Sequence, residues 1–193
     1  MRRFVILGAK ATASADFLLV DLPGTSGRLD VLLRCLRAAL LVSHGLRRDT
    51  VVYLVLGGGP EAPRAVRVDG AAARYLRPDE RSLAVLAKKA LTTPRSGNGF
   101  EVVRPGIAVA DGGLDAVLED LGPCPRFLLD EGGEDVRASA LPRDGAFFIG
   151  DHIGVPDIAR EALGARAISV GPVSLHAEDV VTVLCNELDR RGE

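Results

Sequence analysis

The sequence predicts an α/β fold with a mostly parallel sheet and helices on both of its faces. Short runs of branched aliphatic residues alternate with longer segments whose apolar residues recur at helical spacing, which is the pattern of strands followed by crossover helices. The 193 residues are 47% hydrophobic but only 4% aromatic, and tryptophan is absent. The core is therefore expected to consist of Leu, Val, Ile and Ala, as in buried parallel strands covered by helices.

Five short apolar runs bounded by turn residues predict the buried strands. They are Arg3–Leu7, Val51–Leu56, Arg126–Asp130, Ala146–Gly150 and Arg166–Gly171. Each of the last three ends in Gly or Asp and continues into a loop. Open parallel sheets bind ligands at the carboxyl ends of their strands, so a ligand is expected at these loops. None of them carries a phosphate-binding or dinucleotide fingerprint, which disfavours a nucleotide-dependent oxidoreductase.

Five amphipathic segments between and after these strands predict the helices. They are Arg28–His44, Asp79–Leu91, Leu114–Leu121, Val155–Leu163 and Leu175–Leu188. In the first, leucines recur on one side, Ser26 is the expected N-cap and Gly45 the expected stop. Thr92–Gly99, which is rich in Gly, Ser and Pro, predicts a flexible connection.

The charge is divided unevenly along what we expect to be one domain, residues 1–193. Residues 1–95 carry 16 basic and 8 acidic side chains, whereas residues 96–193 carry 8 basic and 18 acidic ones. This asymmetry predicts that the basic part faces a polyanion such as RNA and that the acidic part has another task. A drift of charge along an ordinary soluble chain is the alternative.

The cysteines and the amino-terminal segment bear on the compartment. Cys35, Cys124 and Cys185 lie far apart and form no CxxC pair, so neither a disulfide framework nor a metal site is expected. The apolar stretch from residue 4 to 9 is broken by Lys10, which favours a first strand over a secretory signal. No apolar run approaches the roughly 20 residues of a membrane span. We expect a cytoplasmic protein.

Several motifs resemble known methyltransferases. "FFIGDHIGVP" (147–156) and "AISVGPVSLHAEDVV" (167–181) resemble the cofactor-binding motifs of the SPOUT methyltransferases. "DLPGTSGRLDVLLRCLRAALLVSHGLRRD" (21–49), "RPDERSLAVLAKKAL" (77–91) and "RPGIAVADGGLDAVLEDL" (104–121) resemble the TrmY family, the tRNA pseudouridine(54) N1-methyltransferases. The resemblance covers nearly the whole chain, and the Gly-Arg-Leu-Asp stretch is its most specific part.

The resemblance implies a deep trefoil knot in the carboxyl-terminal part, S-adenosylmethionine as cofactor, and a homodimer formed through the knot, in which one subunit completes its partner's site. The implied reaction methylates N1 of pseudouridine in the T-loop of tRNA. The implied cofactor-binding residues are Leu129, Gly150, Val170, Gly171, Pro172, Val173, Ser174, Leu175 and Val180. Val180 stands where archaeal members often carry a cysteine, and Cys185 follows one turn later.

Residues of the first long helix are candidates for the chemistry. Asp30, Arg34 and Arg37 share one face of it, since they recur at i, i+4 and i+7. A carboxylate could take the proton from N1, and a guanidinium could stabilise the charge that develops on the base. Asp30 and Arg34 are therefore the candidate catalytic residues. An ordinary Asp–Arg pair on a solvated face is the alternative.

Further charged residues are candidates for contacts to the RNA. Arg28, Arg47, Arg48 and Asp49 are the candidate substrate-binding residues, and Arg77, Arg81, Lys88 and Lys89 extend the basic surface.

Other functions remain open at the level of sequence. The RNA target could be pseudouridine in ribosomal RNA, or the chain could be a noncatalytic RNA-binding protein on the same scaffold. Asp151 and His152 are interpreted as loop residues that follow a strand, and His176 is expected in the first turn of the last helix.

Overall fold

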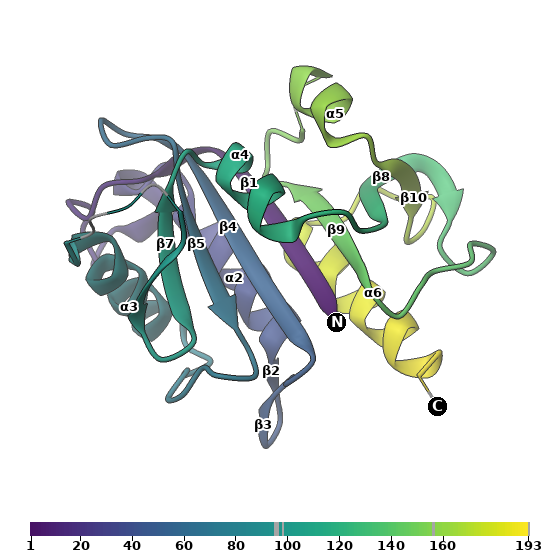
Figure 1. Cartoon of the computed structure of the whole chain (residues 1–193), viewed down its shortest axis with the longest axis horizontal. Coiled ribbons are helices and arrows are strands. Elements are labelled where there is room, and N and C mark those ends of the chain that lie inside the picture. Colours follow the sequence, from purple (N-terminus) through teal and green to yellow (C-terminus); the bar gives the residue numbers. More distant parts are fainter. Residues whose placement is uncertain (95–96, 98, 156, 193) are drawn as a thin grey trace.

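The computed structural model describes residues 1–94, 97, 99–155 and 157–192 and contains one eight-stranded sheet. The strands follow the order β10-β8-β9-β1-β4-β5-β7-β6 (Figure 1). Their bounds are β1 Arg2–Thr12, β4 Thr50–Gly58, β5 Arg64–Asp69, β6 Glu101–Arg104, β7 Ile107–Asp111, β8 Arg126–Asp135, β9 Gly145–Gly150 and β10 Arg166–Ser169. In the connection expected at Thr92–Gly99, residues 95, 96 and 98 lie outside the described residues.

The sheet has a parallel part and an antiparallel part. β10, β8, β9, β1 and β4 pair in parallel, and β5, β7 and β6 continue the sheet in antiparallel pairs. The five predicted strands are confirmed, and together they form the parallel part. The three antiparallel strands were not predicted. β5 alternates buried apolar residues with partly exposed charged ones, Arg64, Arg67 and Asp69, so it lacks the continuous apolar run of a strand buried on both faces.

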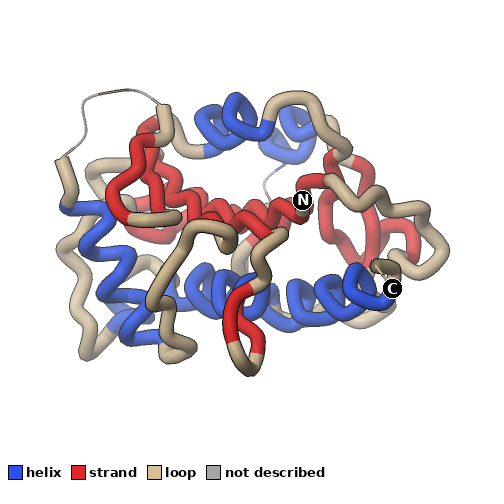
Figure 2. The backbone as a smooth tube through the Cα atoms, turned by 60° about the horizontal axis from the view of Figure 1, so that its bottom comes forward, coloured by secondary structure: helices blue, strands red, loops and turns tan. Residues whose placement is uncertain are grey.

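Helices cover both faces of the sheet, as expected (Figure 2). On one face lie α2 (Leu29–Leu40), α3 (Glu80–Thr92) and α6 (Ala177–Arg190). On the other lie α4 (Leu114–Leu121) and α5 (Asp157–Leu163). Successive side chains of β1 are buried on opposite faces of the sheet. Phe4 and Ile6 pack in the core under α2, and Val5 and Leu7 pack in the core under α4. No helix in the described ranges has both the length and the apolar character of a membrane span.

The first long helix is shorter than expected at both ends. It begins at Leu29 rather than Arg28, because Arg28 occupies the N-cap with a left-handed backbone (φ 71°). It ends at Leu40 rather than His44, because the next residues form a small hairpin of β2 (Leu41–Val42) and β3 (Gly45–Leu46). Gly45 thus belongs to the hairpin and is not a helix stop. The prediction of Ser26 as the N-cap is also wrong, because Arg28 occupies that position, although the Ser26 Oγ accepts a 3.1 Å hydrogen bond from the backbone N–H of Leu29, the first residue of the helix.

The other element ends differ by a few residues. α5 begins at Asp157 instead of Val155, and α6 spans Ala177–Arg190 instead of Leu175–Leu188, with His176 at its N-cap. β10 ends at Ser169, two residues before Gly171. β8 continues beyond Asp130, because Glu134 and Asp135 pair with the last two residues of β10.

Backbone hydrogen bonds connect the two ends of α2 to opposite edges of the parallel part of the sheet. At the carboxyl edge, the backbone N–H of Thr12 in β1 donates to the carbonyl of Ser26, just before α2. At the amino edge, the N–H of Arg47 donates to the carbonyl of Leu40, the last residue of α2. A side chain early in α2 therefore lies near the carboxyl ends of the strands, and one late in α2 lies near their amino ends.

Candidate cofactor and substrate site

A cavity of about 790 Å³ opens at the carboxyl edge of the parallel strands. We call it the carboxyl-edge pocket. Its walls are residues 129–131 of β8, the loops after β9 and β10, the first turn of α6 and the first turns of α2. Of the residues expected to bind cofactor, Leu129, Gly150, Val170, Gly171, Val173, Ser174, Leu175 and Val180 line it. Pro172 lies in the same loop but does not line the pocket.

The loop after β9 is held by Asp151, a buried carboxylate. Its Oδ2 accepts a 3.0 Å hydrogen bond from the backbone N–H of Ala9, and its Oδ1 accepts one of 2.8 Å from Ile153. A side chain at Gly150 would press on the backbone of Gly154, with a Cβ only 2.5 Å from its carbonyl carbon. Asp151 therefore binds the loop to β1. His152 is exposed, and its Nδ1 lies 3.8 Å from the Asp151 carboxylate, beyond hydrogen-bonding distance.

The loop after β10 presents backbone to the pocket. The Ser169 hydroxyl donates to the Gly171 carbonyl at 2.7 Å and fixes the start of the loop. A Cβ on Gly171 would meet nothing within 4 Å, so this backbone is open to a ligand. The loop ends at His176, whose carbonyl accepts from the N–H groups of Asp179 and Val180 as α6 begins. Its imidazole makes no capping hydrogen bond.

The backbone conformation of the turn before α2 requires glycine at position 27. Gly27 has a φ of 60°, and a Cβ on it would lie 1.9 Å from the carbonyl oxygen of Lys10. Only glycine fits such a position. Arg28 is also left-handed, and its side chain reaches back over the helix start, where Nε and Nη2 donate to the two oxygens of Asp30 at 3.0 and 3.1 Å.

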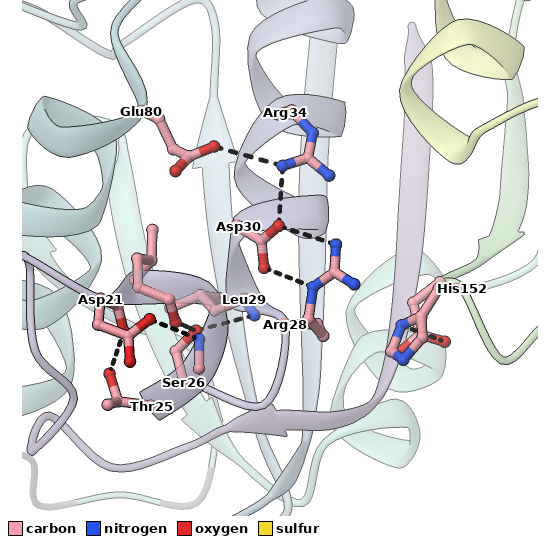
Figure 3. Close-up of polar contacts among 12 residues, drawn as sticks. Asp21, Thr25, Ser26, Arg28, Leu29, Asp30, Arg34, Glu80 and His152 are labelled. Atoms are coloured by element: carbon pink, nitrogen blue, oxygen red, sulfur yellow. Dashed lines mark hydrogen bonds and ion pairs between the residues drawn. The ribbon is translucent and has the colours of Figure 1, made fainter.

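Asp30 is a buried carboxylate that two arginines share (Figure 3). It is 1% exposed, and its Oδ2 also accepts a 2.8 Å hydrogen bond from Nη1 of Arg34. Burial alone would raise the pKa of the Asp30 carboxyl, but the hydrogen bonds and charges of Arg28 and Arg34 outweigh it and hold the pKa below its ordinary value. Asp30 does not line the pocket, whereas both arginines do.

Arg34 is fixed by carboxylates from three helices. Besides Asp30, its Nε donates to Glu178 of α6 at 2.7 Å, and its Nη1 donates to Glu80 of α3 at 3.3 Å. Burial lowers the pKa of the Arg34 guanidinium, and these carboxylates raise it by more, so it is permanently charged. One nitrogen of each guanidinium, Nη1 of Arg28 and Nη2 of Arg34, donates to no described residue. Both nitrogens can therefore serve a ligand.

Arg47, Arg48 and Asp49 lie at the opposite, amino edge of the sheet and do not line the carboxyl-edge pocket. Nη1 of Arg47 donates to Asp189 of α6 at 2.7 Å. Nη1 of Arg48 donates to the carbonyls of Gly70, Ala71 and Ala73. Asp49 pairs with Arg2 at 3.3 Å. The structure thus brings Arg28, Asp30 and Arg34 together with the expected cofactor loops and separates the other three from them.

Comparison with known proteins identifies the family. A family model described as "Putative SAM-dependent RNA methyltransferase" matches residues 1–192. The chain is 45% identical to a protein of Methanosarcina acetivorans named tRNA (pseudouridine(54)-N(1))-methyltransferase, in an alignment that covers all of this chain and 95% of the relative. The chain belongs to this methyltransferase family. A pseudouridine(54) N1-methyltransferase of Halobacterium salinarum is 41% identical, with 100% and 98% of the two chains covered.

A solved structure carries the same fold. The crystal structure of Archaeoglobus fulgidus Nep1 bound to S-adenosylhomocysteine superposes with a TM-score of 0.68, at 18% identity and with 100% and 99% of the two chains covered. At that identity the likeness is one of fold. It places this pseudouridine(54) N1-methyltransferase family member among α/β proteins with a mostly parallel sheet.

The carboxyl-edge pocket fits S-adenosylmethionine, the cofactor of the pseudouridine(54) N1-methyltransferase family. Its volume lies within the range of pockets that enclose small molecules. Leu129, Ile149 and Val170 offer apolar contact to an adenine ring, and the open backbone at Gly171 offers hydrogen bonds. Asp130, Glu131 and Asp179 supply negative charge for the ammonium and sulfonium groups. A hydrogen bond from Arg160 keeps the pKa of Asp130 low, so this carboxylate stays ionised.

The site contains two residues that the sequence did not single out, Glu80 and Glu178. Both stand in the first turn of a helix, where acidic residues are common, so neither draws attention by itself. Their partner Arg34 is 46 and 144 residues away in the chain. Only the packing of α2 against α3 and α6 brings the three together.

Proposed function

We propose that this chain transfers the methyl group of S-adenosylmethionine to N1 of pseudouridine 54 in tRNA. Its family and the names of its relatives support the reaction. The observation that carries the assignment is that two fixed guanidiniums, each with one unused nitrogen, line the same pocket as the two glycine-containing loops after β9 and β10. Such a site can hold a cofactor and stabilise an anionic base side by side.

The chemistry divides between the cofactor and the arginines. S-adenosylmethionine, when bound, supplies a methyl group on a positively charged sulfur, which is already a good leaving group. Residues 129–131 of β8 and the loops after β9 and β10 would hold it, and the target nitrogen must lie in line with the methyl group. When N1 loses its proton to water, negative charge spreads over the pyrimidine ring and its carbonyl oxygens. Nη1 of Arg28 and Nη2 of Arg34 are placed to donate hydrogen bonds to those oxygens.

Asp30 serves this reaction as a positioning residue. It is buried behind the two arginines, does not line the pocket, and has a lowered pKa, so it is both out of reach and a weak base. A base must come within hydrogen-bonding distance of the proton that it removes. Asp30 instead binds both guanidiniums and so fixes their positions relative to each other. Its contribution to the rate is therefore the orientation of Arg28 and Arg34.

Three finer expectations belong to the same proposal: a deep trefoil knot in the carboxyl-terminal part, a homodimer, and a cytoplasmic location. Exposed apolar side chains at the rim of the pocket support the dimer, because Ile153, Val173 and Leu175 are each more than two-fifths exposed. A second subunit placed there would cover them. Sedimentation equilibrium measures the mass directly, and a monomer at micromolar concentration would contradict the dimer.

The test is methyl transfer from labelled S-adenosylmethionine to two T-arm RNA hairpins that differ in one nucleotide. One carries pseudouridine at position 54, and the other carries uridine. We expect label only in the first hairpin, at N1. A ribosomal RNA hairpin that contains pseudouridine is the third substrate. Transfer to that hairpin alone would replace tRNA as the target, and cofactor binding without transfer to any RNA would favour a noncatalytic RNA-binding protein.

A further inference from the structure

A second cavity, of about 1090 Å³, lies at the other end of α2. We call it the amino-edge groove. Its walls are the end of α2, the β2–β3 hairpin, the middle of α6 and the segment 73–78. In Figure 2 the hairpin projects from the body of the protein beside the helical layer that contains α2 and α6. The reaction proposed above does not use this groove.

The groove is lined by positive charge. Four arginines face it, Arg37, Arg47, Arg48 and Arg74, and none of the described residues that line it is acidic. Arg47 and Arg48 are engaged, the first with Asp189 and the second with three backbone carbonyls. Arg37 and Arg74 are exposed, and their guanidiniums make no hydrogen bond or ion pair with any other described residue. These two guanidiniums are available to phosphate groups.

Tyr75 exposes its ring at the rim of the groove, on a segment whose backbone is anchored. Its side chain is 95% exposed, and its backbone φ is 60°, a conformation that tyrosine rarely adopts. The chain is anchored on both sides of it: Ala73 is 1% exposed and Leu76 packs against the main core. Arg48 fixes the preceding segment through its bonds to the carbonyls of residues 70, 71 and 73. The fold therefore accepts a strained backbone and exposes an aromatic ring to water.

The groove and the carboxyl-edge pocket share two walls. Along α2, Arg34 lines the pocket and Arg37, three residues later, lines the groove. Along α6, Val180 lines the pocket and Thr182 and Cys185 line the groove. Since α2 rises 1.5 Å per residue, its 12 residues separate the far ends of the two sites by about 18 Å. A strand of RNA with one nucleotide in the pocket can therefore reach the groove.

We propose that the amino-edge groove binds unstacked nucleotides of the RNA substrate next to the one that is methylated. Tyr75 stacks on a base, and Arg37 and Arg74 contact the neighbouring phosphates. Bases in RNA loops are accessible to aromatic rings, whereas bases in a duplex are not. The combination of a positive groove with an exposed ring is the pattern of single-strand recognition. An acidic protein segment would use the arginines but not the ring. This inference rests on the proposed function, because it takes RNA as the substrate.

The experiment measures binding apart from catalysis. The full-length chain is titrated into a fluorescein-labelled T-arm hairpin that contains pseudouridine, and the dissociation constant is read from anisotropy at several salt concentrations. The variants are Tyr75→Ala, Tyr75→Phe and the double variant Arg37→Ala/Arg74→Ala. Arg166→Ala, at an exposed arginine of β10, the strand at the opposite edge of the sheet from β6, is the matched control, since Arg166 lines neither cavity. Calorimetry with S-adenosylmethionine and circular dichroism check that each variant retains the pocket and the fold.

We expect Tyr75→Ala to weaken RNA binding about tenfold, and Tyr75→Phe to remain within about twofold of the wild type, since phenylalanine retains the stacking face. The double variant should lower the dependence of affinity on salt by about two released ions. In turnover, Tyr75→Ala should raise KM for the hairpin and leave kcat nearly unchanged, because the groove binds ground state and transition state alike.

Two results would overturn the inference. One is equal affinity of the wild type and Tyr75→Ala for the hairpin. The other is a change in sedimentation mass for Tyr75→Ala with unchanged RNA affinity, which would make the groove a contact between copies of this chain. Failure of the proposed function would look different: the wild type would bind hairpin and cofactor but transfer no methyl group, and the anisotropy comparison would still test the groove.

Discussion

Asp30 and Arg34 form a 2.8 Å ion pair of which only the arginine reaches the pocket. The carboxylate is 1% exposed and also binds Arg28, so it is the buried centre of a pair of guanidiniums. A charge in this position is stable only with its partners, because an unpaired buried charge costs several kcal/mol. The same contacts that stabilise Asp30 fix the direction of the two arginines. The proposed role of the two arginines therefore predicts that stability and catalysis are coupled at Asp30.

The change Asp30→Asn tests that coupling. The amide has the same shape but no charge, so it leaves two guanidiniums side by side without their common partner. We expect the free energy of unfolding to fall by about 3 kcal/mol and kcat to fall about a hundredfold. Urea unfolding followed by circular dichroism and single-turnover methyl transfer measure the two effects. Asp16→Asn, at an exposed carboxylate, is the control and should change neither. Full activity of Asp30→Asn would contradict the positioning role.

The lowered pKa of Asp30 predicts a dependence of stability on pH. Because the folded state holds the pKa below its ordinary value, ionised Asp30 stabilises the fold at any pH above the ordinary aspartate value of about 4. This contribution is lost as pH falls from there through the lower pKa of the folded state. The wild type should therefore lose stability more steeply below pH 4 than Asp30→Asn does. Urea unfolding at pH values between about 2.5 and 6 gives both slopes, and parallel slopes would show that Asp30 is not the group responsible.

The sequence predicted the parallel strands because each contains a run of apolar residues, and the runs in β1, β4 and β9 are buried. It did not predict β5 and β6, in which charged residues interrupt or flank the apolar ones, or β7, whose buried apolar run Ile107–Ala110 is short. It placed the end of α2 too late, because Leu41 and Val42 continue the apolar pattern while their backbone turns into a hairpin. A hairpin of two residues per strand leaves no period to detect.

The site was predictable where it is local in the chain. Asp30 and Arg34 are one helical turn apart, so the sequence predicted that they lie together. It grouped Arg37 with them and Arg28 with Arg47, whereas in the structure Arg28 binds Asp30 and Arg37 lines the amino-edge groove. The sequence did not show at which edge of the sheet each arginine lies, because this depends on contacts between residues that are far apart in the chain. Arg28 and Arg47 are both near ends of α2, but the ends lie at opposite edges of the sheet, and Arg47 binds Asp189 from the other end of the chain. That separation depends on the register of β1 against β4 and β9.

Gly150 and Gly171 both line the pocket but should respond differently to alanine. A Cβ at residue 150 would lie 2.5 Å from the backbone of Gly154, so Gly150→Ala must displace the loop that Asp151 holds. A Cβ at residue 171 meets nothing in the protein and enters the space of the ligand. We expect Gly150→Ala to lower both thermal stability and cofactor affinity, and Gly171→Ala to lower only the affinity, about tenfold. Thermal melts and calorimetry with S-adenosylmethionine separate the two. Unchanged affinity of Gly171→Ala would remove that loop from the cofactor site.

The cysteines should differ in reactivity, and the difference tests whether the pocket depends on a thiol. Burial, the largest cause, raises the pKa of Cys185 to about 11 and also raises the pKa of Cys35. At pH 7.5 a pKa of about 11 leaves on the order of one Cys185 in 3,000 as the reactive thiolate.

Cys124 is only half-buried and lines neither cavity. We expect a maleimide at pH 7.5 to label Cys124 first, as read by peptide mass spectrometry, and urea to expose all three. Because none of the described residues that line the carboxyl-edge pocket is a cysteine, the labelled protein should bind S-adenosylmethionine as the unlabelled one does. Labelling of Cys185 ahead of Cys124 would show that the amino-edge groove opens in solution. A loss of cofactor affinity after labelling of Cys124 would show that cofactor binding depends on a thiol outside the pocket.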